Sequence, residues 1–347
     1  MVIVLSLTGL FIYIKIVSQE NKKDEGFVNA SPTDSNEFVC KANNFACIKN
    51  LMIDLNKSDE NALVFGNSQL GAINQFSEGE INYAHQLSLN SLQNRDRQLI
   101  IRSIWMPNAT LNEFKEIYLS IKKCSTRIDN LIIPLFLDDM REQKNRESLE
   151  NYSLNICDTI PKLSDNKKEI KVNLDIISNS DKLDRKILKN THVLKDIKSI
   201  NSHFRVFVYK LRNSILGITA STKRKIISPA YEYNLEALKS IIESRNSPKM
   251  VTIIYIPPLL NFSSGKEIPY FKNDYLNFKD EMKDICNKQN CSFFDLDSII
   301  PDEKWGYKKS TSLKGNKKEI DFMHFTYNGH QIMSKRLIEI LNNHIYK

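Results

Sequence analysis

Short apolar runs separated by turn residues and charged stretches recur along most of this chain. Such runs predict buried β-strands. The strand candidates are Ala62–Phe65, Ile81–Leu89, Leu131–Leu137, Met250–Ile256 and Cys291–Leu296. Pro257 and Pro258 stop the fourth run, and Pro134 within the third indicates a bend or a sheet edge.

Between these runs, apolar residues return at helical spacing. Helices are predicted from Asn108–Thr110, a cap-like start, to Cys124, and over Ser91–Ile104, Asn273–Lys288 and Thr326–His344. Strands that alternate with helices favour a mainly parallel sheet covered on both faces. The sequence therefore predicts an α/β fold with three layers, α/β/α.

The first residues of the chain differ from the rest. Met1 to Val17 is almost entirely apolar, near the lower limit of about 17 to 25 residues for a membrane span. A signal peptide is the alternative, but its basic n-region is missing; a buried strand or helix is a third possibility. We interpret residues 1–18 as a transmembrane or signal anchor.

Composition predicts the remaining organisation. Residues 19–58 are polar and are interpreted as a linker, with one small apolar turn around Phe38 to Ile53. Residues 59–347 are interpreted as one α/β domain. Within it, the segment at about 140–225 is charged and rich in Asn, with apolar residues at helical intervals, which predicts a helical insertion.

Charge and cysteine usage limit the location and the partners. Lys15, Lys22 and Lys23 follow the apolar segment, which by the positive-inside rule places the body in the cytoplasm. Cysteine spacing favours an extracytoplasmic body instead, because close pairs suit disulfides in an oxidising compartment. Free buried thiols are the alternative. The six cysteines fall as Cys40/Cys47, Cys124/Cys157 and Cys286/Cys291. We expect an extracytoplasmic body, in the periplasm or at the cell surface.

The formal net charge of +8 does not predict nucleic-acid binding. Basic and acidic residues are interleaved, without a long basic block or zinc-finger spacing. No cysteine has a neighbouring His or second Cys at metal-site spacing, so a zinc site is not expected. The positive balance favours proximity to an anionic membrane or polymer.

Two distant segments carry candidate chemistry. Gly66-Asn67-Ser68 follows an apolar strand, and Asp321 and His324 stand three residues apart near the C-terminus. A serine hydroxyl needs a base to remove its proton, and a carboxylate fixes the tautomer of that base. We predict that Ser68 is a nucleophile, His324 its general base and Asp321 the group that orients the imidazole. A serine between strand and helix also lies at the ligand-binding edge of an open α/β sheet.

Each residue also has a purely structural interpretation. Ser68 is a possible helix cap, Asp321 a turn cap and His324 a half-buried histidine. Among the other polar residues, packing is the simpler role for His85 and His330, and turn formation is the simpler role for Asp295 and Asp297.

The paired segments resemble the SGNH/GDSL hydrolases. Phe65-Gly66-Asn67-Ser68 is similar to their nucleophile block, and Asp321-x-x-His324 with the following Gly329-His330 is similar to their last block. The resemblance covers about residues 61–342. It implies a flavodoxin-like three-layer fold, a Ser–His–Asp triad, an acyl-enzyme and no cofactor.

The chain departs from this family at three places. Asn67 replaces the usual Asp, and no glycine matches the second block, so Asn90 or Ser91 is the candidate oxyanion donor beside the Ser68 backbone N–H. Asp138-Asp139 stands where the third block has its Asn. An ionised carboxylate repels an oxyanion, which makes a silent site an open alternative.

An anchor followed by this body is similar to membrane-tethered members that modify cell-surface polymers. That similarity implies an esterase or O-acyltransferase acting on a cell-envelope or secreted glycan, with a membrane-bound O-acyltransferase as a possible partner. One alternative is a catalytically inactive partner or scaffold of such a system. A cytoplasm-facing hydrolase of small esters is the other.

Overall fold

The structure is a computed structural model, and its description covers part of the chain. The described residues are 29–30, 38–93, 99–143, 145–146, 149, 152, 156, 207–218, 222–245, 247, 249–260, 269–308 and 319–345. The chain divides into two compact units, the first made of Met1–Glu25, Pro161–Thr219 and Ser310–Lys317. Within that unit the description covers a helix at 207–216. All that follows concerns the second unit.

A six-stranded sheet forms the centre of the second unit. Each neighbouring pair of strands is parallel. The order is β2 (Val39–Lys41), β5 (Leu99–Trp105), β3 (Glu60–Gly66), β6 (Asn130–Pro134), β7 (Val251–Ile256) and β8 (Ser292–Asp295). Residues 61–66 of β3 and all of β6 are buried, as expected for a sheet covered on both faces. The predicted parallel α/β sheet is confirmed.

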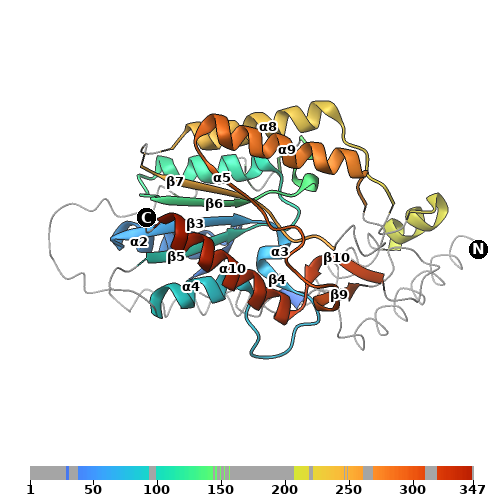
Figure 1. Cartoon of the computed structure of the whole chain (residues 1–347), viewed down its shortest axis with the longest axis horizontal. Helices are drawn as coiled ribbons and strands as arrows, with labels where there is room; N and C mark the ends of the chain where they lie inside the picture. Colours follow the sequence, from blue (N-terminus) through green and yellow to red (C-terminus); the bar gives the residue numbers. More distant parts are fainter. Residues whose placement is uncertain are drawn as a thin grey trace, which may run out of the picture. The chain divides into compact units, whose positions relative to one another are not determined.

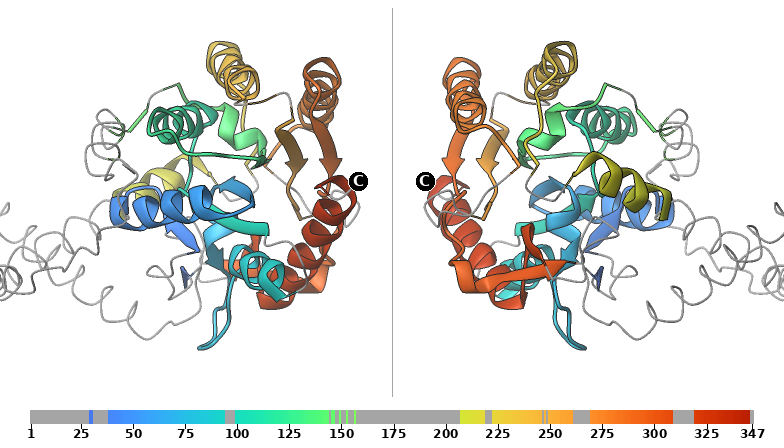
Figure 2. Two further views of the ribbon diagram at one scale, coloured as in Figure 1. Left: turned by 90° about the vertical axis from the view of Figure 1, so that its left-hand side faces the viewer. Right: turned by 90° about the vertical axis from the view of Figure 1, so that its right-hand side faces the viewer.

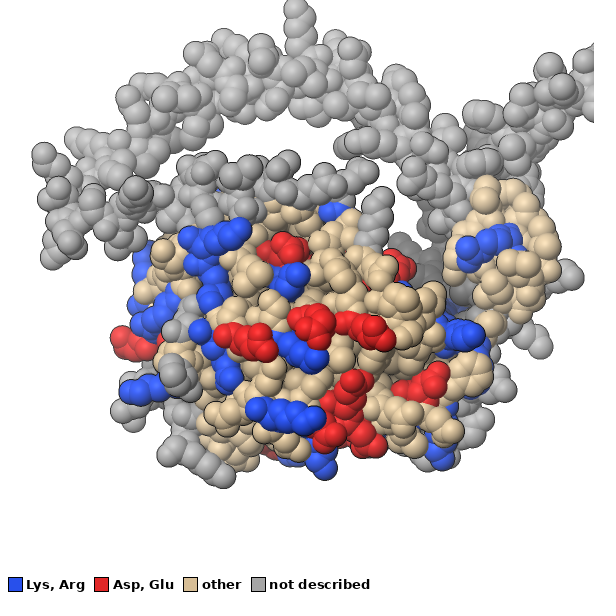
Figure 3. Space-filling view, turned by 90° about the horizontal axis from the view of Figure 1, so that it is seen from above, with Lys and Arg blue, Asp and Glu red and all other residues tan. Residues whose placement is uncertain are grey.

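Helices cover both faces of this sheet (Figures 1 and 2). On one face lie α5 (Leu111–Lys123), α8 (Ser228–Glu243) and α9 (Lys272–Gln289); on the other lie α4 (Tyr83–Gln93) and α10 (Tyr327–Ile345). A further helix, α2 (Phe45–Lys57), packs on β2 and β5. The three layers agree with the predicted architecture. Figure 3 shows that basic and acidic side chains are interleaved on the face seen from above.

Two predicted elements have the wrong type. Ile81–Leu89 was expected as a strand, but it belongs to helix α4, whose buried Tyr83, Ala84 and Leu87 recur at helical spacing. Asn82 begins this helix, because its Oδ1 accepts a hydrogen bond from the His85 N–H (3.0 Å). The predicted helix over Ser91–Ile104 holds for residues 91–93, which end α4, but it is wrong for residues 99–104, which belong to strand β5.

The predicted linker at 19–58 is wrong over its second half. Residues 39–41 form β2 at the edge of the main sheet, and α2 buries Ile48, Leu51 and Leu55 against the core. The Asn44 side chain accepts a hydrogen bond from the Cys47 N–H and caps this helix. The apolar turn expected there is therefore a packed helix.

The helical insertion is only partly described. Residues 157–206 lie outside the described residues, whereas Leu149, Tyr152 and Ile156 belong to the main hydrophobic core. The predicted boundary at about 140 is therefore too early. Pro134 stands at the end of β6, a central strand between β3 and β7, and not at a sheet edge.

Residues 1–18 of the predicted anchor lie outside the described residues. Among the residues that the structure describes, no helix combines the length and the apolar character needed to cross a membrane. Two of the predicted cysteine pairs are disulfides, Cys40–Cys47 and Cys286–Cys291. Cys124 is also disulfide-bonded, and Cys157 lies outside the described residues.

A second, smaller sheet completes the unit at its C-terminal part. The strands β9 (Trp305–Lys308) and β10 (Glu319–Phe325) pair antiparallel, and their register shifts between Ile320 and Phe325. The one-turn helix α3 (Ser68–Gly71) contacts β10. It leads into β4 (Ala72–Ile73), which pairs with β1 (Asn29–Ala30).

The Cys40–Cys47 disulfide joins β2 to α2, and both cysteines are buried. We expect the double variant Cys40→Ala/Cys47→Ala to lose about 2 to 3 kcal/mol of unfolding free energy, because the short closed loop no longer restricts the unfolded chain. Urea denaturation under oxidising conditions measures this loss, with the reduced wild-type protein as a comparison. An unchanged midpoint and slope would contradict it.

Candidate active site

Ser68 lies where the central strand β3 turns into α3. The strand ends at Gly66, where an added Cβ would lie 2.5 Å from the Cβ of Leu70, so this tight turn has no room for a side chain. Asn67 caps the helix, because its Oδ1 accepts a hydrogen bond from the Gln69 N–H (3.0 Å). The capping role considered for Ser68 therefore falls to Asn67, and the serine hydroxyl makes a different contact.

Asp321 and His324 lie in the irregular part of β10. Asp321 Oδ1 accepts hydrogen bonds from the backbone N–H groups of Met323 (3.1 Å) and His324 (3.3 Å). These bonds bend the strand so that the two side chains meet, which a regular strand would prevent by alternation. The Nδ1 of His324 lies 2.9 Å from Asp321 Oδ2.

The structure brings the three predicted side chains into one chain of contacts. His324 Nε2 lies 2.9 Å from Ser68 Oγ, on the other side of the ring from Asp321. A carboxylate accepts only, so Nδ1 carries the proton and Nε2 is left to accept from the serine hydroxyl. In this arrangement His324 can take the proton of Ser68 while the serine oxygen attacks an electrophilic carbon.

The electrostatic balance at Asp321 favours its ionised form. Burial acts to raise the pKa of this carboxyl, but the hydrogen bond and charge of His324, together with Lys308, hold the pKa below its usual value. The side chain of Asp321 is 4% exposed and that of His324 is 14% exposed. The imidazole is therefore the more accessible of the two groups.

Gln69 connects the segment that carries Ser68 to the segment that carries His324. Its Nε2 donates hydrogen bonds to the carbonyl oxygens of Pro258 (2.8 Å) and Met323 (2.6 Å). The residue after Ser68 is thereby tied to the residue before His324. Sequence reasoning missed Gln69, and its position beside the serine was the only available signal.

The structure does not bring Asn90 and Ser91 to Ser68. Both follow Ser88 on α4, and Ser88 Oγ donates to the carbonyl of Ile101 (2.9 Å) in the middle of β5. Ile101 pairs with Ala62, well before the end of β3. This part of α4 therefore lies beside the middle of β5, and no described contact supports Asn90 or Ser91 as an oxyanion donor. The Ser68 backbone remains as the predicted donor.

The carboxyls after β6 are less repulsive than the sequence implied. Burial raises the pKa of Asp139 well above its usual range, which favours an uncharged carboxyl; it accepts hydrogen bonds from the Phe136 N–H (3.0 Å) and Asn67 Nδ2 (3.4 Å). Asp138 forms ion pairs with Arg141 (3.1 Å) and Arg224. The raised pKa of Asp139 and the ion pairs of Asp138 both reduce the repulsion that these carboxyls would exert on an oxyanion.

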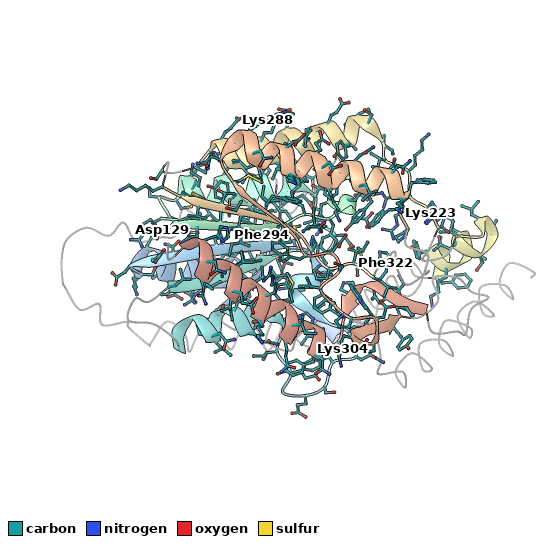
Figure 4. The ribbon with its side chains drawn as sticks, viewed as in Figure 1. Asp129, Lys223, Lys288, Phe294, Lys304 and Phe322 are labelled. Carbon is teal, nitrogen blue, oxygen red and sulfur yellow. A yellow bond between two sulfur atoms is a disulfide. The ribbon has the colours of Figure 1, made fainter. Side chains whose placement is uncertain are left out.

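Two positive side chains flank the strand that carries the base. The guanidinium of Arg224 lies 5.4 Å from the ring centroid of Phe322, and Lys308 Nζ lies 4.6 Å from it. Phe322, labelled in Figure 4, stands on β10 between Asp321 and His324. Of the two cations, Lys308 also acts on Asp321, where its charge helps to lower the pKa of the carboxyl.

The remaining candidate residues have structural roles. His330 is fully buried; its Nδ1 accepts from the Tyr83 N–H (3.1 Å) and its Nε2 donates to the Ala72 carbonyl (3.2 Å). His85 is also buried and its Nδ1 contacts Asn82 Oδ1 (2.8 Å). Asp295 and Asp297 pair with Lys279. Among the described residues, no group of His, Cys, Asp and Glu could hold a metal ion.

The similarities found between this chain and known proteins are to solved structures. No protein-family model matches the sequence, and a search of curated proteins gives no match. The chain is similar to an acetylxylan esterase from Geobacillus stearothermophilus, with 12% identity and a TM-score of 0.42 over 82% of this chain and 95% of that chain. It is also similar to the lipase/acylhydrolase from Enterococcus faecalis, with 12% identity and a TM-score of 0.41 over 82% and 96% of the two chains.

The burial of two imidazoles, those of His330 and His85, predicts that the folded protein loses stability in acid. Burial lowers the pKa of His330 to about 3 and that of His85 to about 4, from 6.5 in the unfolded chain. Between these values the unfolded chain binds protons that the folded protein does not, so stability falls as the pH drops from about 6.5 to about 4.

In the variant His330→Gln we expect the unfolding free energy to depend less steeply on pH, because about one proton fewer is taken up on unfolding. Chemical denaturation of both proteins at a series of pH values measures the two slopes. Equal slopes would show that His330 is not held neutral in the folded state.

Proposed function

We propose that this protein is a serine-dependent esterase or O-acyltransferase of the SGNH/GDSL type, with Ser68, His324 and Asp321 as its catalytic triad. The observation that carries the proposal is the pair of 2.9 Å contacts that place one imidazole between Ser68 Oγ and the Asp321 carboxylate. Such a juxtaposition of residues 256 positions apart in sequence is required for nucleophilic activation. A packing role for the histidine does not require it.

In the proposed reaction, Ser68 Oγ attacks the carbonyl carbon of an ester while its proton passes to His324 Nε2. The tetrahedral intermediate collapses, and the same proton goes to the departing alcohol oxygen. The serine now carries the acyl group as an ester. Water or a sugar hydroxyl then attacks this ester, His324 accepts its proton, and the return of that proton to Ser68 Oγ restores the site.

Asp321 keeps the imidazole in the required tautomer and stabilises the imidazolium that forms in both steps. Its lowered pKa favours the ionised carboxylate that this role requires. For the oxyanion we propose the backbone N–H of Ser68, at the start of α3. The raised pKa of Asp139 and the ion pairs of Asp138 both weaken the electrostatic objection to a negative intermediate.

We further propose that the substrate is an acylated glycan of the cell envelope or a secreted glycan, as the sequence resemblance implies. An anchored protein with an extracytoplasmic body fits this substrate, and the Cys40–Cys47 and Cys286–Cys291 disulfides support an oxidising compartment. A membrane-bound O-acyltransferase is the proposed partner.

One observation favours a second candidate, an inactive partner of an acyltransferase system. The segment after β6 presents Asp138 and Asp139, and neither is an amide donor for an oxyanion. A triad that activates serine without sufficient oxyanion stabilisation would turn over slowly. Labelling of Ser68 by a reactive probe distinguishes the two candidates.

We expect the wild-type protein to hydrolyse 4-nitrophenyl acetate and to react with a fluorophosphonate at Ser68. Ser68→Ala removes the nucleophile, so kcat/KM should fall by about a thousandfold or more. Peptide mass spectrometry locates the adduct, and absorbance at neutral pH follows hydrolysis. The control is Ser88→Ala, which removes the hydroxyl of a buried serine on α4. Folded wild-type protein without an adduct at Ser68 would exclude the catalytic proposal.

Asp321→Asn tests the orienting role. An amide can donate to Nδ1 and stabilise the wrong tautomer, so we expect the fluorophosphonate labelling rate to fall by about 10³ to 10⁴. Thermal denaturation of the variant checks that the fold persists. A folded variant that labels at the wild-type rate would show that Asp321 does not orient His324.

A further inference from the structure

A fourth polar side chain, that of Asn74, contacts the Asp321 carboxylate of the candidate triad. Asn74 follows β4 and is completely buried. Its Nδ2 lies 3.3 Å from Oδ2 of Asp321, the same oxygen that faces His324 Nδ1. No sequence motif pointed to this residue.

The chemistry of the pair fixes the direction of the hydrogen bond. An ionised carboxylate has acceptors only, so Asn74 must present its amino group to Asp321. Its Oδ1 then remains buried without a hydrogen-bond partner among the described residues. An unsatisfied buried oxygen is costly, which argues that this asparagine is present for its donor.

The backbone holds Asn74 at this place. Its N–H donates to the carbonyl of Phe325 (3.1 Å), which ties it to the strand that carries His324. Gly306 on β9 closes the other side, since an added Cβ there would lie 2.1 Å from Asn74 Cγ. The amide therefore has little freedom to turn away from Asp321.

We propose that Asn74 is a positioning residue for the reaction proposed above, which fixes the Asp321 carboxylate so that Oδ2 faces the imidazole. Two backbone N–H groups hold Oδ1, and Asn74 and the imidazole hold Oδ2. With these four donors the carboxylate has one orientation. The proposal rests on the proposed function, but its central measurement does not require activity.

Several charged or titratable groups surround this unit and belong in any account of its pH dependence. Lys308 on β9 acts on Asp321, and Arg224 lies over the ring of the neighbouring Phe322. His330 on α10 interacts with His324 but is held neutral by burial. None of these groups changes in the variants below.

The experiment replaces Asn74 with Asp and, separately, with Ala in the full chain. Asn74→Asp keeps the shape but replaces the amide donor with a carboxyl beside Asp321, so the two carboxyls and the imidazole titrate as a coupled system. Asn74→Ala removes the donor without adding charge. The control is Asn130→Asp, because Asn130 is a buried amide that donates to the Asn61 carbonyl (2.8 Å) at the opposite end of the sheet.

The first readout is the pH titration of the His324 imidazole by NMR, assigned with His324→Gln. In Asn74→Asp we expect this titration to move to higher pH by about one unit or more, because added negative charge favours the imidazolium. In Asn130→Asp it should stay at the wild-type position. A folded Asn74→Asp protein with the wild-type titration would overturn the proposal.

The second readout is the rate of fluorophosphonate labelling at Ser68. We expect Asn74→Ala to label about tenfold more slowly than wild type, because the carboxylate loses one of its donors. Asn74→Ala labelling at the wild-type rate would also overturn the proposal. If wild-type Ser68 is not labelled at all, the proposed function fails, while the imidazole titration still decides whether Asn74 holds Asp321.

Discussion

The hydrogen bonds from the Gln69 amide to the carbonyls of Pro258 and Met323 hold the candidate site together. Ser68 begins α3 directly after β3 of the main parallel sheet, whereas Asp321 and His324 belong to the small antiparallel sheet β9–β10. A proton passes directly between two groups only within hydrogen-bond reach. The Gln69 amide spans the junction between the two sheets and so fixes the distance on which the proposed chemistry depends.

The site also balances two opposing effects on its ionisable groups. Burial alone would neutralise both Asp321 and Asp139. Asp321 has His324 and Lys308 beside it, and these keep it ionised. Asp139 is held by neutral donors, and its burial dominates. The pKa values of two carboxyls in one neighbourhood thus shift in opposite directions, and the carboxyl that the proposed mechanism needs as an anion is the one with the lowered pKa.

Much of the fold was predictable, because its elements carry local signals. The capping pair Thr110–Glu113 marks the start of α5, and the β7 run is stopped by two prolines. The errors came where local signals conflict. In Ile81–Leu89 the apolar residues suit either period, and Asn82 decides for a helix through a contact that a pattern of apolar residues does not contain.

The candidate triad was predictable because serine, histidine and aspartate at those spacings are chemically distinctive. Gln69 and Asn74 were not, because a buried amide has no periodic pattern and its role depends on contacts with distant residues. The charge state of Asp139 was equally hidden, since it follows from burial that only the assembled core creates. Sequence reasoning therefore identified reactive groups better than the groups that position them.

The contact between Gly306 and Asn74 has an evolutionary consequence. The backbone of Gly306 does not adopt the left-handed conformation that favours glycine, so the requirement for glycine is one of space. Any larger residue at 306 would need a smaller one at 74. Glycine at position 306 is thus expected to persist in descendants of this chain for as long as residue 74 is an asparagine, although the two positions lie far apart in sequence.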